Sequence, residues 1–415
     1  RLQSGWQRTE REQGVYNFAW LDRVVDELIA RGMRPWICLC YGNDLYTESA
    51  KQVFGAVGCP PIFTDEEKTA WANYVRATVR HFAGRVTHYE IWNEPDGKWC
   101  WKHGVSAEEY GRFAHDTAKA IREVSDDAFI IGGSVCMIWD LSYMDAALSA
   151  GMAGSVDAVT FHEYTADETA LYTHVPALEA LIHLHDPKIR LIQGESGSQS
   201  RSDGCGALAG GAWTPERQAK QCLRHAVADL STDVLFSSYF SCMDMIEALN
   251  GKVGDKTSYL DYGYFGILGA DFDENGFSSG EYSPKPSYYA YQNLCSVFAE
   301  DPEPCDLPIV RVIRPSASLL GNDYADTLSL HGFRKPGGSF ALAYWAPTPL
   351  LTTTIETTVS FRAAGLPEKM SLVDLIDGTI YDISDFVEKT GSGIIIKNIP
   401  AKDYPMLLTF GDFID

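Results

Sequence analysis

The sequence predicts an α/β barrel followed by a smaller antiparallel β-domain. Over residues 1–302, short apolar runs alternate with stretches whose apolar residues recur at helical spacing, which indicates a parallel sheet with crossover helices. Beyond Pro302 the helical pattern stops, and short strand-like runs with turn signals such as Asp377-Gly378 take its place. We therefore expect two domains, over residues 1–302 and 303–415.

Seven strand-like runs occupy the first region, near residues 1, 34, 86, 129, 156, 189 and 233. A closed (β/α)8 TIM barrel has eight strands, so we expect the first strand to lie upstream of residue 1. The alternative is an open, doubly wound sheet. Such sheets often carry a GxGxxG turn or a phosphate loop, and the sequence contains neither, which favours the barrel.

Apolar spacing and capping residues predict the helices between these strands. Thr64 and Glu67 have the spacing of a capping box, and Ser106 and Glu109 repeat it. Pro215 stands at a first helical position, where its missing N–H costs nothing. The predicted helices include residues 20–32, 64–82, 106–124, 214–230 and 285–298.

The second region reads as an antiparallel β-sandwich. Its strands are expected in "SFALAYWAPT", "TTVSFRAAG", "SLVDLIDGTIYDI", "GIIIKNI" and "PMLLTFGD". The acidic residues of this region fall in turns, so we expect it to serve packing rather than chemistry. Carbohydrate binding is the lesser alternative.

Composition and charge exclude several function classes. The net charge of −22 argues against nucleic acid, whose phosphates need Lys and Arg. The sequence has no apolar run long enough to span a membrane. The ten cysteines form no CxxC pair, so we expect no zinc site, and buried free thiols favour a cytoplasmic location. A disulfide between Cys295 and Cys305 stays open, as does a homo-oligomer. Because the sequence opens on Arg1 rather than Met, we expect the natural N-terminus to lie upstream.

Chemically useful side chains stand at the ends of several predicted strands. In such barrels the site lies at the carboxyl ends of the strands. If the expected upstream strand is counted as the first, the fourth strand ends in Asn93 and Glu94. The sixth carries His162 and Tyr164, which point the same way because they are two residues apart. The seventh strand ends in Glu195. These five residues are therefore expected to converge.

The two glutamates suggest an acid and a nucleophile. Strands four and seven face each other across a barrel, and retaining glycoside hydrolysis needs two carboxyl groups about 5–5.5 Å apart. One of them would protonate the leaving oxygen and the other would attack the anomeric carbon.

These motifs resemble clan A glycoside hydrolases, and most closely family 39, the β-xylosidases and α-L-iduronidases. The strand-four Asn-Glu is the signature of the clan. The resemblance runs over nearly all of the first 300 residues, and the trailing β-sandwich also fits. The segments that carry it are "GVYNFAWLDRVVDELIARGMRPWI", "YEIWNEPD", "TFHEY", "IQGESG", "YGYFGIL" and "SPKPSYYAY".

The resemblance implies roles for individual residues. Glu94 would be the general acid/base, with a pKa raised by burial or by its negative neighbour. Glu195 would be the ionised nucleophile, helped by a hydrogen bond from Tyr164. Asn93 would hydrogen-bond the sugar 2-hydroxyl, and His162 and Tyr164 would contact the sugar and orient the nucleophile.

Two positions depart from the family pattern. Gln3 stands where the family has a pocket histidine, and Phe240 stands where it usually has a tryptophan platform. These departures put the sugar identity in doubt more than the reaction. Further pocket candidates from the residues themselves are Asn43, Trp99, Trp101 and Tyr239.

Two other glutamates compete for a catalytic role. Glu163 alternates with His162 and Tyr164, so it is expected to point away from the pocket. Glu90 has the parity of Glu94 but lies deeper, so it is expected to pair with a buried cation or polar group inside the barrel.

The sequence thus predicts a retaining glycoside hydrolase that needs no metal or organic cofactor. An exo-acting, β-xylosidase-like activity on oligosaccharides is the first expectation. The alternatives are an endo-acting clan A glycanase and a barrel that binds glycans without turnover.

Overall fold

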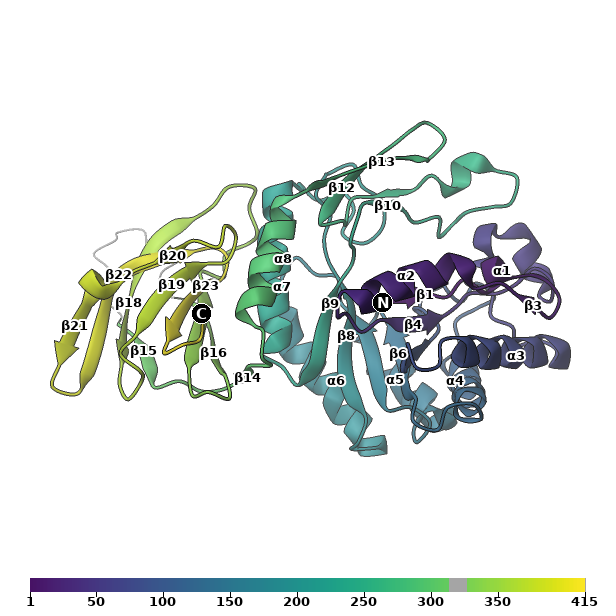
Figure 1. Ribbon diagram of the computed structural model, residues 1–415, viewed down its shortest axis with the longest axis horizontal. Helices are drawn as coiled ribbons and strands as arrows, with labels where there is room; N and C mark the ends of the chain where they lie inside the picture. Colours follow the sequence, from purple (N-terminus) through teal and green to yellow (C-terminus); the bar gives the residue numbers. More distant parts are fainter. Residues whose placement is uncertain (313–326, 415) are drawn as a thin grey trace.

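The computed structural model describes residues 1–312 and 327–414 (Figure 1). Its first part holds a curled, seven-stranded parallel sheet in the order β1-β4-β5-β6-β7-β8-β9. The strands lie where the sequence predicts them, although several are shorter than the apolar runs from which they were predicted. They are β1 Leu2–Gln3, β4 Trp36–Leu39, β5 His88–Ile91, β6 Phe129–Val135, β7 Ala158–His162, β8 Arg190–Ser196 and β9 Val234–Tyr239.

This sheet forms seven of the eight positions of a barrel wall. Each strand pairs in parallel with the next along the chain. The edge strands β1 and β9 pair with one neighbour each within the described sheet, and the wall is open between them. The predicted α/β barrel with a trailing β-sandwich is confirmed as the fold class.

Helices cover the outside of the sheet (Figure 1). They are α1 Trp6–Thr9, α2 Ala19–Ala30, α3 Asp65–His81, α4 Ala107–Arg122, α5 Leu141–Ala147, α6 Leu171–His185, α7 Pro215–Leu230 and α8 Pro286–Val297. The predicted capping box forms completely at Thr64 and Glu67. At Ser106 the hydroxyl accepts from Glu109 N, but the Glu109 carboxylate turns to His103 Nε2 at 3.0 Å. This competing partner explains why the second capping box is half formed.

Short elements at the carboxyl ends of the strands shape the face that carries the site. Two-stranded hairpins are formed by β2 (Glu10–Glu12) with β3 (Val15–Tyr16), β10 (Met245–Ile246) with β11 (Tyr262–Gly263), and β12 (Leu268–Phe272) with β13 (Ser278–Pro284). Short helical turns on this face lie at Glu48–Gln52, Phe54–Ala56, Glu168–Ala170 and Lys256–Tyr259, and a further turn, Leu148–Met152, continues α5 toward the start of β7.

The second part consists of two antiparallel sheets, drawn in yellow-green in Figure 1. One has the order β14-β16-β17-β23-β19-β20 and the other β15-β18-β22-β21. Their bounds are β14 Glu303–Pro304, β15 Ile309–Arg311, β16 Ser329–Arg334, β17 Phe340–Trp345, β18 Glu356–Ala363, β19 Met370–Asp374, β20 Ile380–Tyr381, β21 Val387–Thr390, β22 Gly393–Lys402 and β23 Met406–Phe410. A short turn lies at Ser384–Phe386.

Helices α7 and α8 belong to the core of this sandwich as much as to the barrel. Leu223 and Val227 of α7 and Leu294 of α8 pack in one apolar cluster with residues of both sheets, such as Phe361 and Leu408. The two parts therefore share a continuous core, which a sequence boundary at residue 302 does not reveal.

Two buried ion pairs lie at the same interface, and the first of them crosses it. Lys220 Nζ lies 2.7 Å from Asp403 Oδ2, and both side chains are at most 1% exposed. Arg224 Nη2 lies 2.7 Å from Glu168 Oε1, which also accepts from Trp345 Nε1 at 3.0 Å. Because each charge is paired and hydrogen-bonded, the interface can exclude water without leaving an isolated charge.

Candidate active site

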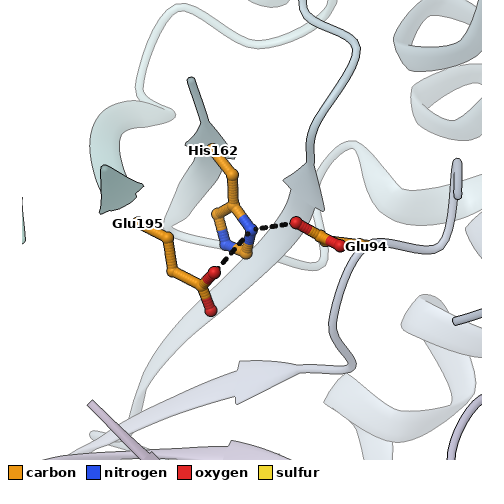
Figure 2. Close-up of side chains that lie close together, drawn as sticks. All are labelled: Glu94, His162 and Glu195. Atoms are coloured by element: carbon orange, nitrogen blue, oxygen red, sulfur yellow. Dashed lines mark hydrogen bonds and ion pairs between the residues drawn. The ribbon is translucent and has the colours of Figure 1, made fainter. Parts of the chain in front are cut away.

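Three side chains meet at the carboxyl ends of neighbouring strands, as Figure 2 shows. Glu94 follows β5, His162 is the last residue of β7, and Glu195 lies near the end of β8. One oxygen of each carboxylate and one imidazole nitrogen all lie within 4.8 Å of one another. The register of three parallel strands thus brings together residues that are up to 101 positions apart in sequence.

His162 lies between the two carboxylates. Its Nδ1 is 3.0 Å from Glu94 Oε1 and 3.4 Å from Glu195 Oε2, and its Nε2 is 3.2 Å from Ser134 Oγ (Figure 2). Burial by itself lowers the pKa of this imidazole, but the charge of Glu195 and the hydrogen bond with Glu94 outweigh burial and raise it. The ring is therefore favoured as the cation in the resting site.

The pKa of Glu94 moves in the direction opposite to our expectation. Burial acts to raise it, but the hydrogen bond and positive charge of His162 outweigh burial and hold the pKa below its usual value. The indole Nε1 of Trp99 donates to Oε2 and acts in the same direction. The sequence-based expectation took account of the charge of Glu195 but not of the His162 cation that lies between the two glutamates.

The backbone around Glu94 is unusual for residues other than glycine. Trp92, Glu94 and Ser134 have φ values of +69°, +44° and +54°. Such conformations cost about 1–3 kcal/mol each and persist where the surroundings hold them. Here Glu94 N donates to Ser134 O at 2.9 Å, which ties the loop after β5 to the end of β6. The strain fixes the direction in which the carboxylate leaves the strand.

Glu195 is held by two donors. The hydroxyl of Tyr164 donates to its Oε2 at 2.9 Å, as the sequence predicts, and the guanidinium of Arg1 donates to its Oε1. The residue is 7% exposed. Both contacts fix the orientation of the carboxylate.

Arg1 is a site residue that the sequence argument missed. Its side chain also donates to Glu90, to Asn93 Oδ1 at 2.8 Å and to Ser134 Oγ at 3.2 Å. Glu90 is fully buried, and this contact supplies the buried cation expected for it. The expectation of a buried cation beside Glu90 already indicated a basic residue in the site. Alternation along the strands does not show which residue supplies that charge.

The other predicted residues divide into two groups. Phe240 and Trp99 lie at the site, because the Phe240 ring is 6.4 Å from that of Tyr164 and Trp99 contacts Glu94. Gln3 lies nearby, with its Nε2 3.4 Å from Tyr41 Oη.

Trp101, Asn43 and Tyr239 lie elsewhere. Trp101 is fully buried among core aromatic rings such as Trp92. Asn43 is fully buried and serves the backbone, since its Nδ2 donates to Glu10 O. The Tyr239 ring packs 5.9 Å from Tyr291 of α8, on the outer side of the sheet.

Glu163 points away from the pocket. Its Oε1 lies 3.7 Å from His174 Nδ1 on α6, on the outside of the sheet. This placement follows from its alternation with His162.

Glu247 is a second missed residue. It follows β10, and its backbone N donates to Asp261 O beyond the hairpin turn. Burial first, and then the charges of Glu94 and Glu195, raise its pKa to about 7. A Cβ at Gly206 would lie 2.3 Å from its Oε1, so the glycine makes room for this carboxylate. Its chain position, in a loop after the last strand of the parallel sheet, gave no sign that it lies close to Glu94 and Glu195.

The trio of Glu94, His162 and Glu195 has a donor set that could also hold a metal ion. The guanidinium of Arg1, however, already contacts Glu195. A second cation there would meet its positive charge, so the arrangement fits hydrogen bonding and proton transfer better than metal binding.

Residues 4–183 match the model of the family described as "Glycosyl hydrolases family 39". Over this part of its length the chain is similar to the family 39 glycosyl hydrolases. The β-xylosidase of Geobacillus stearothermophilus is 29% identical to it over 160 residues, which cover 36% of this chain and 31% of that protein. For the β-xylosidase of Caldicellulosiruptor saccharolyticus the identity is 27% over 169 residues, with coverage of 38% and 33%. The matched segments thus span about a third of these curated relatives.

The fold of the chain is also found among solved structures. A family 39 glycoside hydrolase from the gut symbiont Bacteroides cellulosilyticus WH2 superposes with a TM-score of 0.68 at 17% identity. The alignment covers 99% of this chain and 74% of that one, so the likeness includes the β-sandwich. Within the described residues, no helix of this chain combines the length and apolar character that crossing a membrane requires.

Proposed function

We propose that the protein is a retaining glycoside hydrolase, with Glu94 as acid/base and Glu195 as nucleophile. The observation that carries this proposal is the approach of the two carboxylates, with an oxygen of each within 4.8 Å. Retaining enzymes hold their carboxyl groups about 5–5.5 Å apart, whereas inverting enzymes leave about 6.5–9.5 Å for a water molecule. The similarity to β-xylosidases supports the same reaction class.

In the first step, a Glu195 oxygen attacks the anomeric carbon and the bond to the leaving oxygen breaks. Glu94 donates a proton to that oxygen, and a glycosyl ester forms on Glu195. The proton can reach Glu94 from His162, whose Nδ1 lies 3.0 Å from Oε1. Tyr164 and Arg1 hold the nucleophile during the attack.

In the second step, Glu94 takes a proton from water, and the hydroxide formed attacks the same carbon from the opposite face. The ester bond breaks and Glu195 leaves as a carboxylate. Two inversions restore the configuration of the anomeric carbon. Asn93, whose amide lies beside the pair, is placed to bind a hydroxyl of the reacting sugar.

The loops around the site favour exo action. Lys102 Nζ, in the loop after β5, donates to Val57 O and to Leu249 O at 2.7 Å each. Val53 and Lys252 form an antiparallel bridge, and the rings of Phe54 and Tyr259 stack at 4.3 Å. The loop after β9 is thereby tied across the open side of the sheet to the loop after β4. A glycan would enter by its end rather than lie through a cleft.

Xylose is our first candidate for the released sugar, on the similarity to β-xylosidases. Glu247 is a further buried carboxyl group near Glu94 and Glu195, and in this proposal it would hydrogen-bond sugar hydroxyls. Galactosides, arabinosides and glucosides complete the set to be compared.

The test is the initial hydrolysis rate on a panel of aryl glycosides, for the wild type, Glu195→Gln and Glu163→Gln. Glu163 is the matched control, because it is a buried strand-end glutamate that faces away from the pocket. We expect one sugar to be released by the wild type and the control variant, and none by Glu195→Gln. NMR of the first product should show the retained anomer. An inverted product, or equal rates in the wild type and Glu195→Gln, would overturn the assignment.

A further inference from the structure

A separate hollow of about 390 Å³ lies beside the first hairpin. Its walls include Tyr16 of β3, Tyr46 of the loop after β4, and a stripe of α3 that consists of Asp65, Glu66, Thr69 and Asn73. We call it the Tyr16–Tyr46 hollow. Its volume falls within the range of about 300–1,000 Å³ that ligand pockets occupy.

A buried carboxylate holds one wall of this hollow in place. Glu10 is fully buried and accepts from Trp6 Nε1 at 2.6 Å, from Gly14 N at 2.7 Å and from Tyr46 Oη at 2.6 Å. Tyr46 also stacks on the buried ring of Trp6, with centroids 5.5 Å apart and planes 14° apart. The ring of Tyr46 is thus fixed before any ligand arrives, which lowers the entropic cost of binding.

The other wall offers polar groups at helical spacing. Asp65, Thr69 and Asn73 lie four residues apart along α3, so they share one face of the helix. All three are exposed. A carboxylate, a hydroxyl and an amide together supply donors and acceptors for several hydroxyl groups.

This combination of groups selects a neutral, polyhydroxylated ligand. Aromatic rings stack on the apolar faces of sugar rings, while carboxylate and amide groups bind the hydroxyls around the edge. Asp65 and Glu66 disfavour anions, as does the net charge of −22. Burial first, and then the charge of Glu10, raise the pKa of Tyr16 to about 12, so its phenol stays a neutral donor at working pH.

We propose that the Tyr16–Tyr46 hollow is a second saccharide site, which takes a sugar unit of a neutral xylan-type oligosaccharide. Its residues follow β1 and β4 or open α3, so it lies at the carboxyl ends of the strands, as the catalytic pair does. It is distinct from the catalytic site, with which it shares no residue. Only the class of sugar rests on the proposed function.

The test uses hydrogen exchange of the Glu195→Gln full chain during titration with xylotetraose. We expect slower exchange in two sets of peptides: residues 10–18, 44–48 and 64–75 around the hollow, and residues 88–101 and 189–197 around the catalytic pair. Because the hollow offers one or two ring contacts, we expect it to bind xylotetraose with a Kd of about 1 mM. The two sets of peptides should therefore respond at different xylotetraose concentrations.

Substitutions separate the two sites. In Tyr16→Ala or Asn73→Ala, added to Glu195→Gln, the protection around the hollow should disappear and that around the catalytic pair should persist. Tyr289→Ala is the matched control, because Tyr289 is an exposed tyrosine of α8 far along the chain, and both protections should survive it. Asn73→Ala alters an exposed side chain, so it tests the hollow without loss of packed rings.

The outcomes are distinct. Protection confined to residues 88–101 and 189–197, or protection of the hollow that survives both substitutions, overturns the second site. Failure of the proposed function shows independently, as the absence of hydrolysis by the wild type on the glycoside panel. Protection of the hollow by xylotetraose in such a protein would still support the second site.

Discussion

The Nδ1 atom of His162 lies 3.0 Å from Oε1 of Glu94. The imidazole pKa is raised and the carboxyl pKa is lowered, so the pair keeps its proton on the ring in the resting state. In the proposed mechanism, the leaving oxygen of the substrate would lie near Glu94. The proton would then have a hydrogen-bonded path from His162 to the carboxylate that must donate it.

Trp99→Phe should move the alkaline limb of the pH profile of kcat/KM to higher pH. The indole Nε1 donates to the Glu94 carboxylate and lowers its pKa, so loss of the donor raises the proton affinity of the Glu94–His162 pair. The protonated form then survives to higher pH, by about 0.5–1 pH unit for one hydrogen bond. Phe retains the ring, which separates the hydrogen bond from the packing. The measurement is the rate on a glycoside with a poor leaving group, and an unmoved limb would contradict the contact.

Tyr164→Phe should slow the formation of the glycosyl ester. The hydroxyl donates to Glu195 at 2.9 Å, and burial together with the charge of Glu195 raises the pKa of the phenol, so it stays a donor at alkaline pH. Hydrogen bonds to charged groups contribute about 1.5–3 kcal/mol, which corresponds to about 10- to 150-fold in kcat/KM. Tyr172→Phe is a control on α6, where the hydroxyl lies 2.9 Å from Nε2 of His331 in the β-sandwich. Equal losses in both variants would show a general effect on folding instead.

Glu247→Gln should flatten the pH dependence of stability. The pKa of Glu247 is about 7 in the folded protein and about 4.5 unfolded. The folded state therefore binds this proton more tightly, and the stability gained from it is full below about pH 4.5 and lost as the pH rises through about 7. Glutamine has no such proton to lose. Urea unfolding at about pH 5 and about pH 8 should show a smaller loss in the variant than in the wild type.

The control for that comparison is Glu281→Gln, which alters an exposed glutamate of β13. It should reproduce the wild-type difference between the two pH values. If Glu247→Gln does so as well, the pKa assigned to Glu247 is wrong.

Lys220→Met should destabilise the whole chain. Removal of one partner from a buried ion pair leaves an isolated charge, here Asp403, and costs about 3–5 kcal/mol in the free energy of unfolding. Lys389→Met breaks a pair of exposed side chains with Glu368 and should cost about 0–1 kcal/mol. Urea unfolding compares the two. A loss in Lys220→Met no greater than that in Lys389→Met would mean that water reaches this interface.

The sequence was sufficient to place the strands and the two glutamates. Most of the strands fall in short, largely apolar runs, and parallel strands put their carboxyl ends at one edge of the sheet, so Glu94 and Glu195 were expected to lie near each other. Alternation along β7 also separated His162 and Tyr164 from Glu163. These inferences need only local periodicity.

The remaining features depend on contacts across the fold. Arg1 reaches Glu90 and Glu195 through the register of strands that lie far apart in sequence, which periodicity does not encode. The place of Glu247 depends on how its loop folds back over the strands. The pKa of Glu94 could not be foreseen because it is the balance of burial against one particular imidazole.

The contacts of Lys102 carry a consequence for redesign. Its ammonium group donates to carbonyl oxygens of two loops that lie 192 positions apart in sequence, Val57 and Leu249. Shortening the loop after β9 to admit the middle of a polymer would therefore remove one acceptor and leave a half-buried cation with a single partner. These contacts couple three segments structurally: residues 52–57, Lys102 and residues 249–253. Redesign of this scaffold into an endo-acting enzyme would require all three segments to be exchanged together.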